Sequence, residues 1–108
     1  MAYDEALAAR VRGLLAERSE VREQRMFGGL TFMVRGHMCC GVHGDELIVR
    51  LDSADEADAF ARPHTRPMDF TGPPLPGFVT VGSAGVLGDS LERWVCEAVR
   101  RAESLPPK

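Results

Sequence analysis

Two groups of residues have side chains that could do chemistry, and the first is Cys39, Cys40 and His43 with His37 nearby. Cysteine and histidine are the usual ligands of zinc. His37, Cys39 and His43 would share one face of a strand, but alternate strand residues lie roughly 7 Å apart. No second CxxC or HxxxH is present to complete a tetrahedral site. We therefore predict no metal and no other cofactor, with Cys40 in the core and Cys39 on the surface.

The second group is the segment around Arg62, His64 and Arg66, with Asp69 close by and with Arg25 and Arg50 on strands that could lie near it. Guanidinium groups that converge on a concave surface would bind a phosphate or a carboxylate. The alternative is a solvated loop in which Arg66 pairs with Asp69. The residue types favour this alternative because exposed charges are common on protein surfaces.

No residue is predicted to be catalytic, so we expect a protein that is not an enzyme. The chain has no GxSxG motif, and the sequence pattern places no general base within hydrogen-bond distance of the Cys39 thiol. Gly28-Gly29 is followed by a strand pattern and lacks the GxxxxGK spacing of a phosphate-binding loop. A bend or a β-bulge explains this glycine pair better.

The length of 108 residues is that of a single domain, spanning residues 1–108. The net charge of −3 and the pI of about 5.6 argue against binding to DNA by the domain's own electrostatics. No apolar run approaches the roughly 20 residues that span a membrane, and the N-terminus does not resemble a signal peptide. We expect a cytoplasmic protein without disulfides and without membrane contact.

Three helices and five or six strands are expected around these residues. Apolar residues at helical spacing follow Asp4, a plausible N-cap, to about Arg18. Capping-box patterns at Ser53–Glu56 and Asp89–Glu92 open two further helices. The expected strands are Val21–Phe27, the glycine-divided stretch between Arg25 and Leu51, Met68–Phe70 and Gly77–Val81. The resulting order, α-β(3-4)-α-β(2)-α, predicts an α+β two-layer sandwich with one antiparallel sheet.

The glycine-divided stretch predicts a meander whose turns centre on Gly36-His37 and Gly44-Asp45. This register places one apolar set on the core face: Met33, Met38, Cys40, Val42, Leu47, Val49 and Leu51. The other face then receives Leu30, Phe32, Val34, Cys39, Gly41, Ile48 and Arg50, with His43 and Glu46 at one end. A slip of one residue would exchange the two sets.

One pattern extends over nearly the whole chain. It comprises Arg25-Met-Phe-Gly-Gly29, then Phe32, Gly36, Met38, Gly41, Asp45, Leu47, Arg50, Met68-Asp-Phe70, Gly77-Phe78 and Leu91-x-x-Trp94-Val95. In this pattern the chain resembles the N-terminal domain of the TfoX/Sxy proteins. This resemblance implies a two-layer α+β fold of the type III secretion chaperone-like kind. Full-length members of that family regulate natural competence, are thought to act with the cyclic-AMP receptor protein, and carry a C-terminal helical domain. We expect this chain to be a stand-alone N-terminal domain, for which the family implies no catalytic residue and no cofactor.

The leading functional hypothesis is a non-enzymatic protein-interaction module, accessory to transcriptional regulation. Its expected interaction face is Phe32, Val34, Cys39, Ile48 and Arg50, where an uncovered apolar centre would require a protein partner or a homodimer. The alternative is a small-anion-binding protein or enzyme that uses Arg25, Arg62, His64, Arg66 and Asp69.

Overall fold

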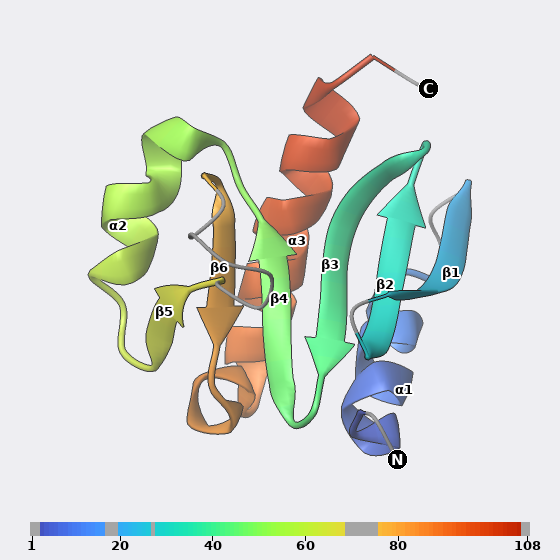
Figure 1. The fold of residues 1–108 in the computed structure, drawn as a ribbon, viewed down its shortest axis with the longest axis horizontal. Coiled ribbons are helices and arrows are strands. Elements are labelled where there is room, and N and C mark those ends of the chain that lie inside the picture. Colours follow the sequence, from blue (N-terminus) through green and yellow to red (C-terminus); the bar gives the residue numbers. More distant parts are fainter. Residues whose placement is uncertain (1–2, 17–19, 27, 69–75, 107–108) are drawn as a thin grey trace.

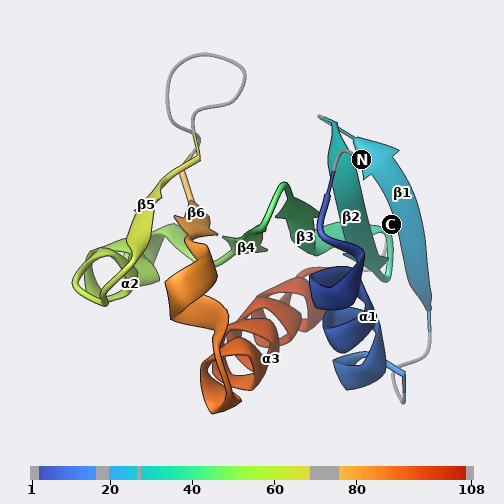
Figure 2. The ribbon, with the colours of Figure 1, turned by 90° about the horizontal axis from the view of Figure 1, so that it is seen from below.

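The computed structural model describes residues 3–16, 20–26, 28–68 and 76–106. One six-stranded antiparallel sheet, in the order β1-β2-β3-β4-β6-β5, forms the middle of the molecule (Figure 1). Helices α1 and α3 lie side by side on one face of this sheet (Figure 2). The predicted α+β two-layer fold with one antiparallel sheet is therefore confirmed. None of the described helices has the length and apolar character needed to cross a membrane.

The helices and strands are, in chain order, α1 (Glu5–Leu14), β1 (Val21–Met26), β2 (Gly29–Val34), β3 (His37–His43), β4 (Glu46–Arg50), η1 (Ser53–Asp55), α2 (Glu56–Phe60), β5 (Thr65–Pro67), β6 (Phe78–Val81), η2 (Ser83–Val86) and α3 (Asp89–Ser104). The segment predicted to form a strand at Met68–Phe70 instead has its strand, β5, at Thr65–Pro67. Residues 69 and 70 lie outside the described residues, as does Phe27, the last residue of the strand predicted at Val21–Phe27.

One predicted helix cap is present, and two are not. The Asp4 carboxylate accepts from the backbone N–H groups of Ala6 and Leu7 at 2.9 and 3.1 Å, so Asp4 caps α1 as expected. The capping box at Ser53 is wrong, because Asp52 supplies the capping oxygen and Glu56 accepts from the backbone N–H of Gly77. Helix α3 likewise has Gly88 as its N-cap, with no side-chain capping bond.

Helix α3 supplies the main apolar layer against the sheet. Its predicted stripe is buried at every position, comprising Leu91, Trp94, Val95, Ala98, Val99 and Ala102. These positions recur at helical spacing, so they face one side of the helix and pack on the sheet beneath them. The same helix contacts α1, which explains why the two helices form a single layer.

The register of the meander agrees with the prediction in one hairpin and departs from it in the other. Strands β3 and β4 pair as predicted, with Cys40 opposite Val49 and Val42 opposite Leu47. Strands β2 and β3 turn at Arg35 and Gly36, both at positive φ, so Val34 lies opposite His37 and not opposite Cys39. A shift in register between Phe32 and Met33 then adds one residue to β3.

This bulge moves several side chains to the other face. Phe32 lies opposite Cys40 and Leu30 lies opposite Val42, so both join the helix-covered core. Val34 and Cys39 belong to the same core. Met33 and Met38, predicted to be core residues, face each other outside the core cluster and are only partly buried. The predicted face assignment is therefore wrong for β2 and for the first half of β3, and right for β4.

Candidate functional site

The face of the sheet opposite α1 and α3, here called the second face, carries the side chains that alternate with the core residues. By this alternation its members are Arg22, Gln24, Thr31, Met33, Met38, His43, Glu46, Ile48, Arg50, Arg66, Phe78 and Thr80. Of the predicted interaction residues, only Ile48 and Arg50 lie on this face. Phe32, Val34 and Cys39 are at most 1% exposed on the other side, so they cannot contact a partner.

The second face has a buried polar and apolar centre with more accessible apolar side chains around it. Thr31, Ile48 and Thr80 are nearly inaccessible, with at most 5% exposed. Met33 and Met38 form a half-buried cross-strand pair. Arg50 lies over the ring of Phe78, 5.8 Å from its centroid, on the neighbouring strand. Reasoning from strand alternation alone missed Met33 and Met38, because the bulge exchanges their face.

At one end of the second face, Arg66 of β5 forms a bidentate ion pair with Glu46 of β4. One guanidinium nitrogen donates to Glu46 Oε1 at 2.6 Å, and a second donates to Oε2. This hydrogen bond and the positive charge of Arg66 hold the pKa of Glu46 below its ordinary value. The carboxylate of Glu46 is therefore the partner of Arg66, a contact between residues far apart in the sequence that no local pattern indicates.

Replacing Glu46 with glutamine tests this pair through its pH dependence. Because the folded-state pKa of Glu46 is lowered, its stabilisation is complete above the unfolded value of about 4.3 and is lost as pH falls through the folded value. Since Arg66 is half exposed, we expect Glu46→Gln to lower the free energy of unfolding by less than about 1 kcal/mol at pH 7. Urea unfolding should show this difference shrinking below about pH 4. A difference that stays constant down to pH 3 would contradict the pair's contribution.

Two residues of the predicted anion loop, Arg62 and His64, line one hollow, but the Arg62 guanidinium is already paired with a carboxylate. Arg62 donates to both carboxylate oxygens of Glu97 at 2.6 and 2.7 Å, and its guanidinium stacks 4.3 Å from the ring centroid of Trp94. The hydrogen bonds that Arg62 donates to the Glu97 carboxylate raise the pKa of Arg62. A hollow of about 340 Å³ is lined by Arg62, His64 and Arg93, among others.

Arg25 is separated from this loop by the whole width of the sheet. It lies on β1, at the edge opposite β5. The prediction that Arg25 and the loop residues surround one anion is therefore wrong, because the strand order places them at opposite edges. Asp69, the other residue predicted for this site, lies outside the described residues.

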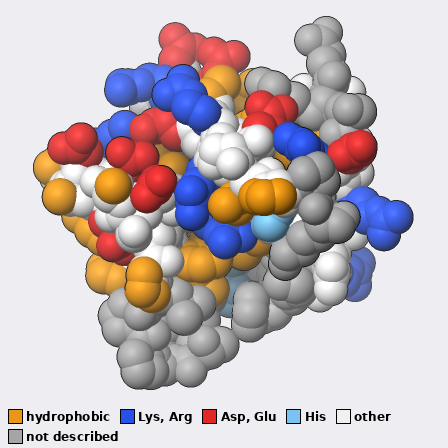
Figure 3. All heavy atoms as spheres, turned by 90° about the horizontal axis from the view of Figure 1, so that it is seen from above, with side chains coloured by type: hydrophobic (Ala, Val, Ile, Leu, Met, Phe, Trp, Pro, Cys, Tyr) orange, Lys and Arg blue, Asp and Glu red, His pale blue; other side chains and the backbone are white. Residues whose placement is uncertain are grey.

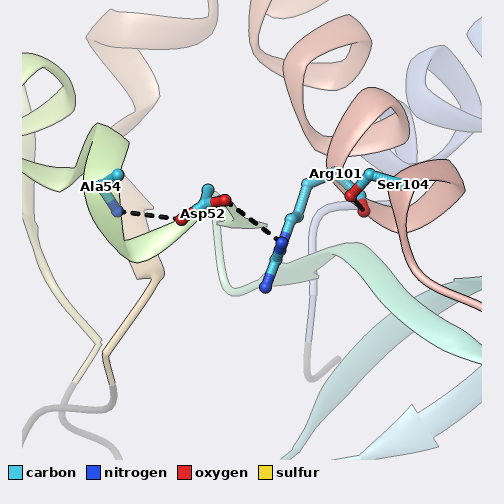
Figure 4. A network of polar contacts seen from close by, with 4 residues as sticks. All are labelled: Asp52, Ala54, Arg101 and Ser104. Atoms are coloured by element: carbon cyan, nitrogen blue, oxygen red, sulfur yellow. Dashed lines mark hydrogen bonds and ion pairs between the residues drawn. The ribbon is translucent and has the colours of Figure 1, made fainter.

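Acidic and basic side chains alternate at the end of the molecule where α3 terminates (Figure 3). A hollow of about 300 Å³ there is lined by Asp52, Asp55 and Asp58 and by Arg62, Arg100 and Arg101, among others. Arg101 donates to Asp52 Oδ2 at 3.3 Å, while Asp52 Oδ1 accepts from the backbone N–H of Ala54 (Figure 4). Both signs of charge are present, so this hollow does not select an anion.

The cysteine and histidine residues of β3 are spread along the strand. His37 and His43 are at opposite ends of β3, roughly 20 Å apart by strand rise. His37 Nε2 donates to the carbonyl of Pro106 at 2.6 Å, and both thiols are fully buried. A hydrogen bond with Cys39, together with burial, raises the pKa of the Cys40 thiol. Within the described ranges, no three His, Cys, Asp or Glu side chains are placed to hold a metal ion.

Comparison with known proteins adds one match. The family model described as the TfoX N-terminal domain matches residues 13–102, which is most of the chain. No curated protein and no solved structure matches. The matched range runs from the last residues of α1 nearly to the end of α3 and so includes the whole sheet. The chain belongs to the TfoX N-terminal domain family.

Proposed function

We propose that this domain is a non-enzymatic protein-interaction module that acts as an accessory in transcriptional regulation. Membership of the TfoX N-terminal domain family supports the regulatory part of this proposal. A role in transcription implies a cytoplasmic location. The net charge of −3 favours contact with a regulatory protein over direct contact with DNA.

The observation that carries the interaction role is the difference between the two faces of the sheet. Helices α1 and α3 cover one face only (Figure 2). On the second face, the half-buried side chains of Met33, Met38 and Phe78 surround a nearly inaccessible centre. Methionine adapts to the shape of a partner, and aromatic and arginine side chains such as Phe78 and Arg50 are enriched at protein interfaces.

A capture experiment in the native host tests this proposal. Tagged wild-type protein should retain a regulatory protein that is absent from the empty-tag control and that also binds the purified domain by calorimetry. Met33→Glu places a charge in the middle of the methionine pair, and Arg50→Glu reverses a charge on the same face without removing an apolar side chain. We expect both to reduce binding at least about tenfold, as removal of an interface hot spot does.

The matched control is Leu87→Glu, the same kind of change at a side chain that is 66% exposed and lies just before α3. This variant should bind like the wild type, and circular dichroism should show that all variants are folded. A partner retained equally by Met33→Glu and by wild type would overturn the second face as the interface. No regulatory protein above the empty-tag level would overturn the interaction role.

A further inference from the structure

Strand β1 is an edge strand, and its outer side has no partner among the described residues (Figure 1). The direction of its backbone groups follows from one hydrogen bond. The backbone N–H of Arg35 donates to the carbonyl of Glu20 at 3.1 Å, so residue 20 directs its backbone toward β2. Because direction alternates along a strand, Gln24 also faces β2, whereas Glu23 and Arg25 direct their N–H and C=O groups outward.

We infer that β1 pairs with β1 of a second copy of this chain, antiparallel about a two-fold axis at Gln24. In this register Glu23 of each copy lies directly opposite Arg25 of the other, and each such pair exchanges both of its outward backbone hydrogen bonds. The two side chains lie on the same face, where opposite charges attract. The side-chain amide of Gln24 meets its own copy across the axis and can both donate and accept.

The symmetric registers centred on the charged residues of β1 bring like charges together. An axis at Glu23 places this carboxylate opposite its own copy, and axes at Arg22 or Arg25 place arginine opposite arginine. Charged edge strands commonly prevent unspecific pairing. Among axes at residues 22–25, the order Arg-Glu-Gln-Arg therefore disfavours three registers and leaves the one at Gln24, which is complementary to itself. The charges therefore argue for a second copy as the occupant of this edge.

An ion pair of the monomer is compatible with this pairing. Glu23 also accepts from Arg12 of α1 at 2.6 and 2.7 Å, which fixes its carboxylate beside the edge. The pairing uses the outer side of β1 and not the second face, so it is independent of the function proposed above. A dimer formed in this way would continue the second face across the axis into the partner.

Sedimentation velocity over a concentration series from micromolar to millimolar tests the pairing. The wild type should pass from monomer to dimer. Arg25→Glu creates two carboxylate pairs across the axis and should weaken the dimer about tenfold or more. Arg25→Pro removes an outward N–H without removing a bond to β2 and should weaken it similarly. The matched control, Arg22→Glu, makes the same charge change opposite Met26 of the second copy and should dimerise like the wild type.

Two further measurements show whether the dimer uses the proposed register: a double variant that restores the charge pairs, and amide hydrogen exchange of the β1 backbone. Glu23→Arg combined with Arg25→Glu re-forms two opposite-charge pairs, so it should dimerise more tightly than Arg25→Glu alone. Amide hydrogen exchange at Glu23 and Arg25 should slow as concentration rises, whereas exchange at Gln24, which faces β2, should not change. A wild type that stays monomeric overturns the inference, as does a dimer that is as stable in Arg25→Glu and Arg25→Pro as in the wild type. Neither result would affect the capture experiment on the second face.

Discussion

Replacing Phe32 with alanine is expected to lower the free energy of unfolding by about 3–5 kcal/mol, the usual range for a buried phenylalanine. Phe32 is 0% exposed and is the largest of the fully buried side chains. It lies opposite Cys40 in the helix-covered core. The loss would remove much of the stability of a domain of this size. Urea unfolding followed by circular dichroism measures it.

The matched control is Phe60→Ala on α2, where the ring is 36% exposed. Because about a third of this residue already contacts water, its removal should cost only about 1–2 kcal/mol. If Phe32→Ala left the unfolding midpoint unchanged, the side chain would have to lie on the surface. The register of β2 against β3 would then be the one without the bulge, and Phe32 would again be an interface candidate.

Replacing Gly77 with alanine should also destabilise the fold strongly, by about 3 kcal/mol, because strain and a backbone clash add. Gly77 has φ +84°, a conformation that side chains other than glycine rarely adopt. An added Cβ would lie 2.6 Å from the carbonyl oxygen of Leu51, and a backbone atom cannot move aside cheaply. The same residue binds Leu51 and Glu56 through its C=O and N–H.

Gly44→Ala separates the strain from the clash. Gly44 also has a positive φ, +58°, but an added Cβ would meet no atom within 4 Å. We therefore expect this control to cost only about 1 kcal/mol. The difference between the two losses of unfolding free energy measures the cost of the contact between an added Cβ at residue 77 and the carbonyl oxygen of Leu51. Equal losses in the two variants would show that the contact with Leu51 relaxes.

The bulge in β3 decides which surface is available to a partner. Without it, Phe32 and Val34 would have formed the apolar centre of the second face. With it, they complete the core, and Met33 and Met38 take their place outside. The proposed partner contact on the second face therefore depends on the bulge, and the proposed pairing of two copies depends on β1. Both can be tested with single substitutions of partly or fully exposed residues.

The sequence alone determined the elements whose signal is local. The apolar spacing of α3 placed six residues on one face, and all six are buried. The turn at Gly44 and Asp45 set the register of β3 on β4 correctly, because the apolar alternation on both sides agrees with it. The family resemblance, which rests on the arrangement of glycine and aromatic residues along the chain, is also confirmed.

Only the tertiary structure decided the features that depend on contacts between distant segments. A bulge adds a residue without any signature in the alternation of side chains, so Cys39 was predicted to be outside and is inside. From the sequence, Arg62 and Arg66 could be assigned to an anion site because their carboxylate partners are not local. Glu97 and Glu46 are separated from them by 35 and 20 residues. Ion pairs of this kind require the folded arrangement, since their geometry depends on how α3 and β4 approach the segment around β5. Local residue patterns therefore specify helices and tight turns, whereas the packing of the whole domain specifies which side chains remain available for binding.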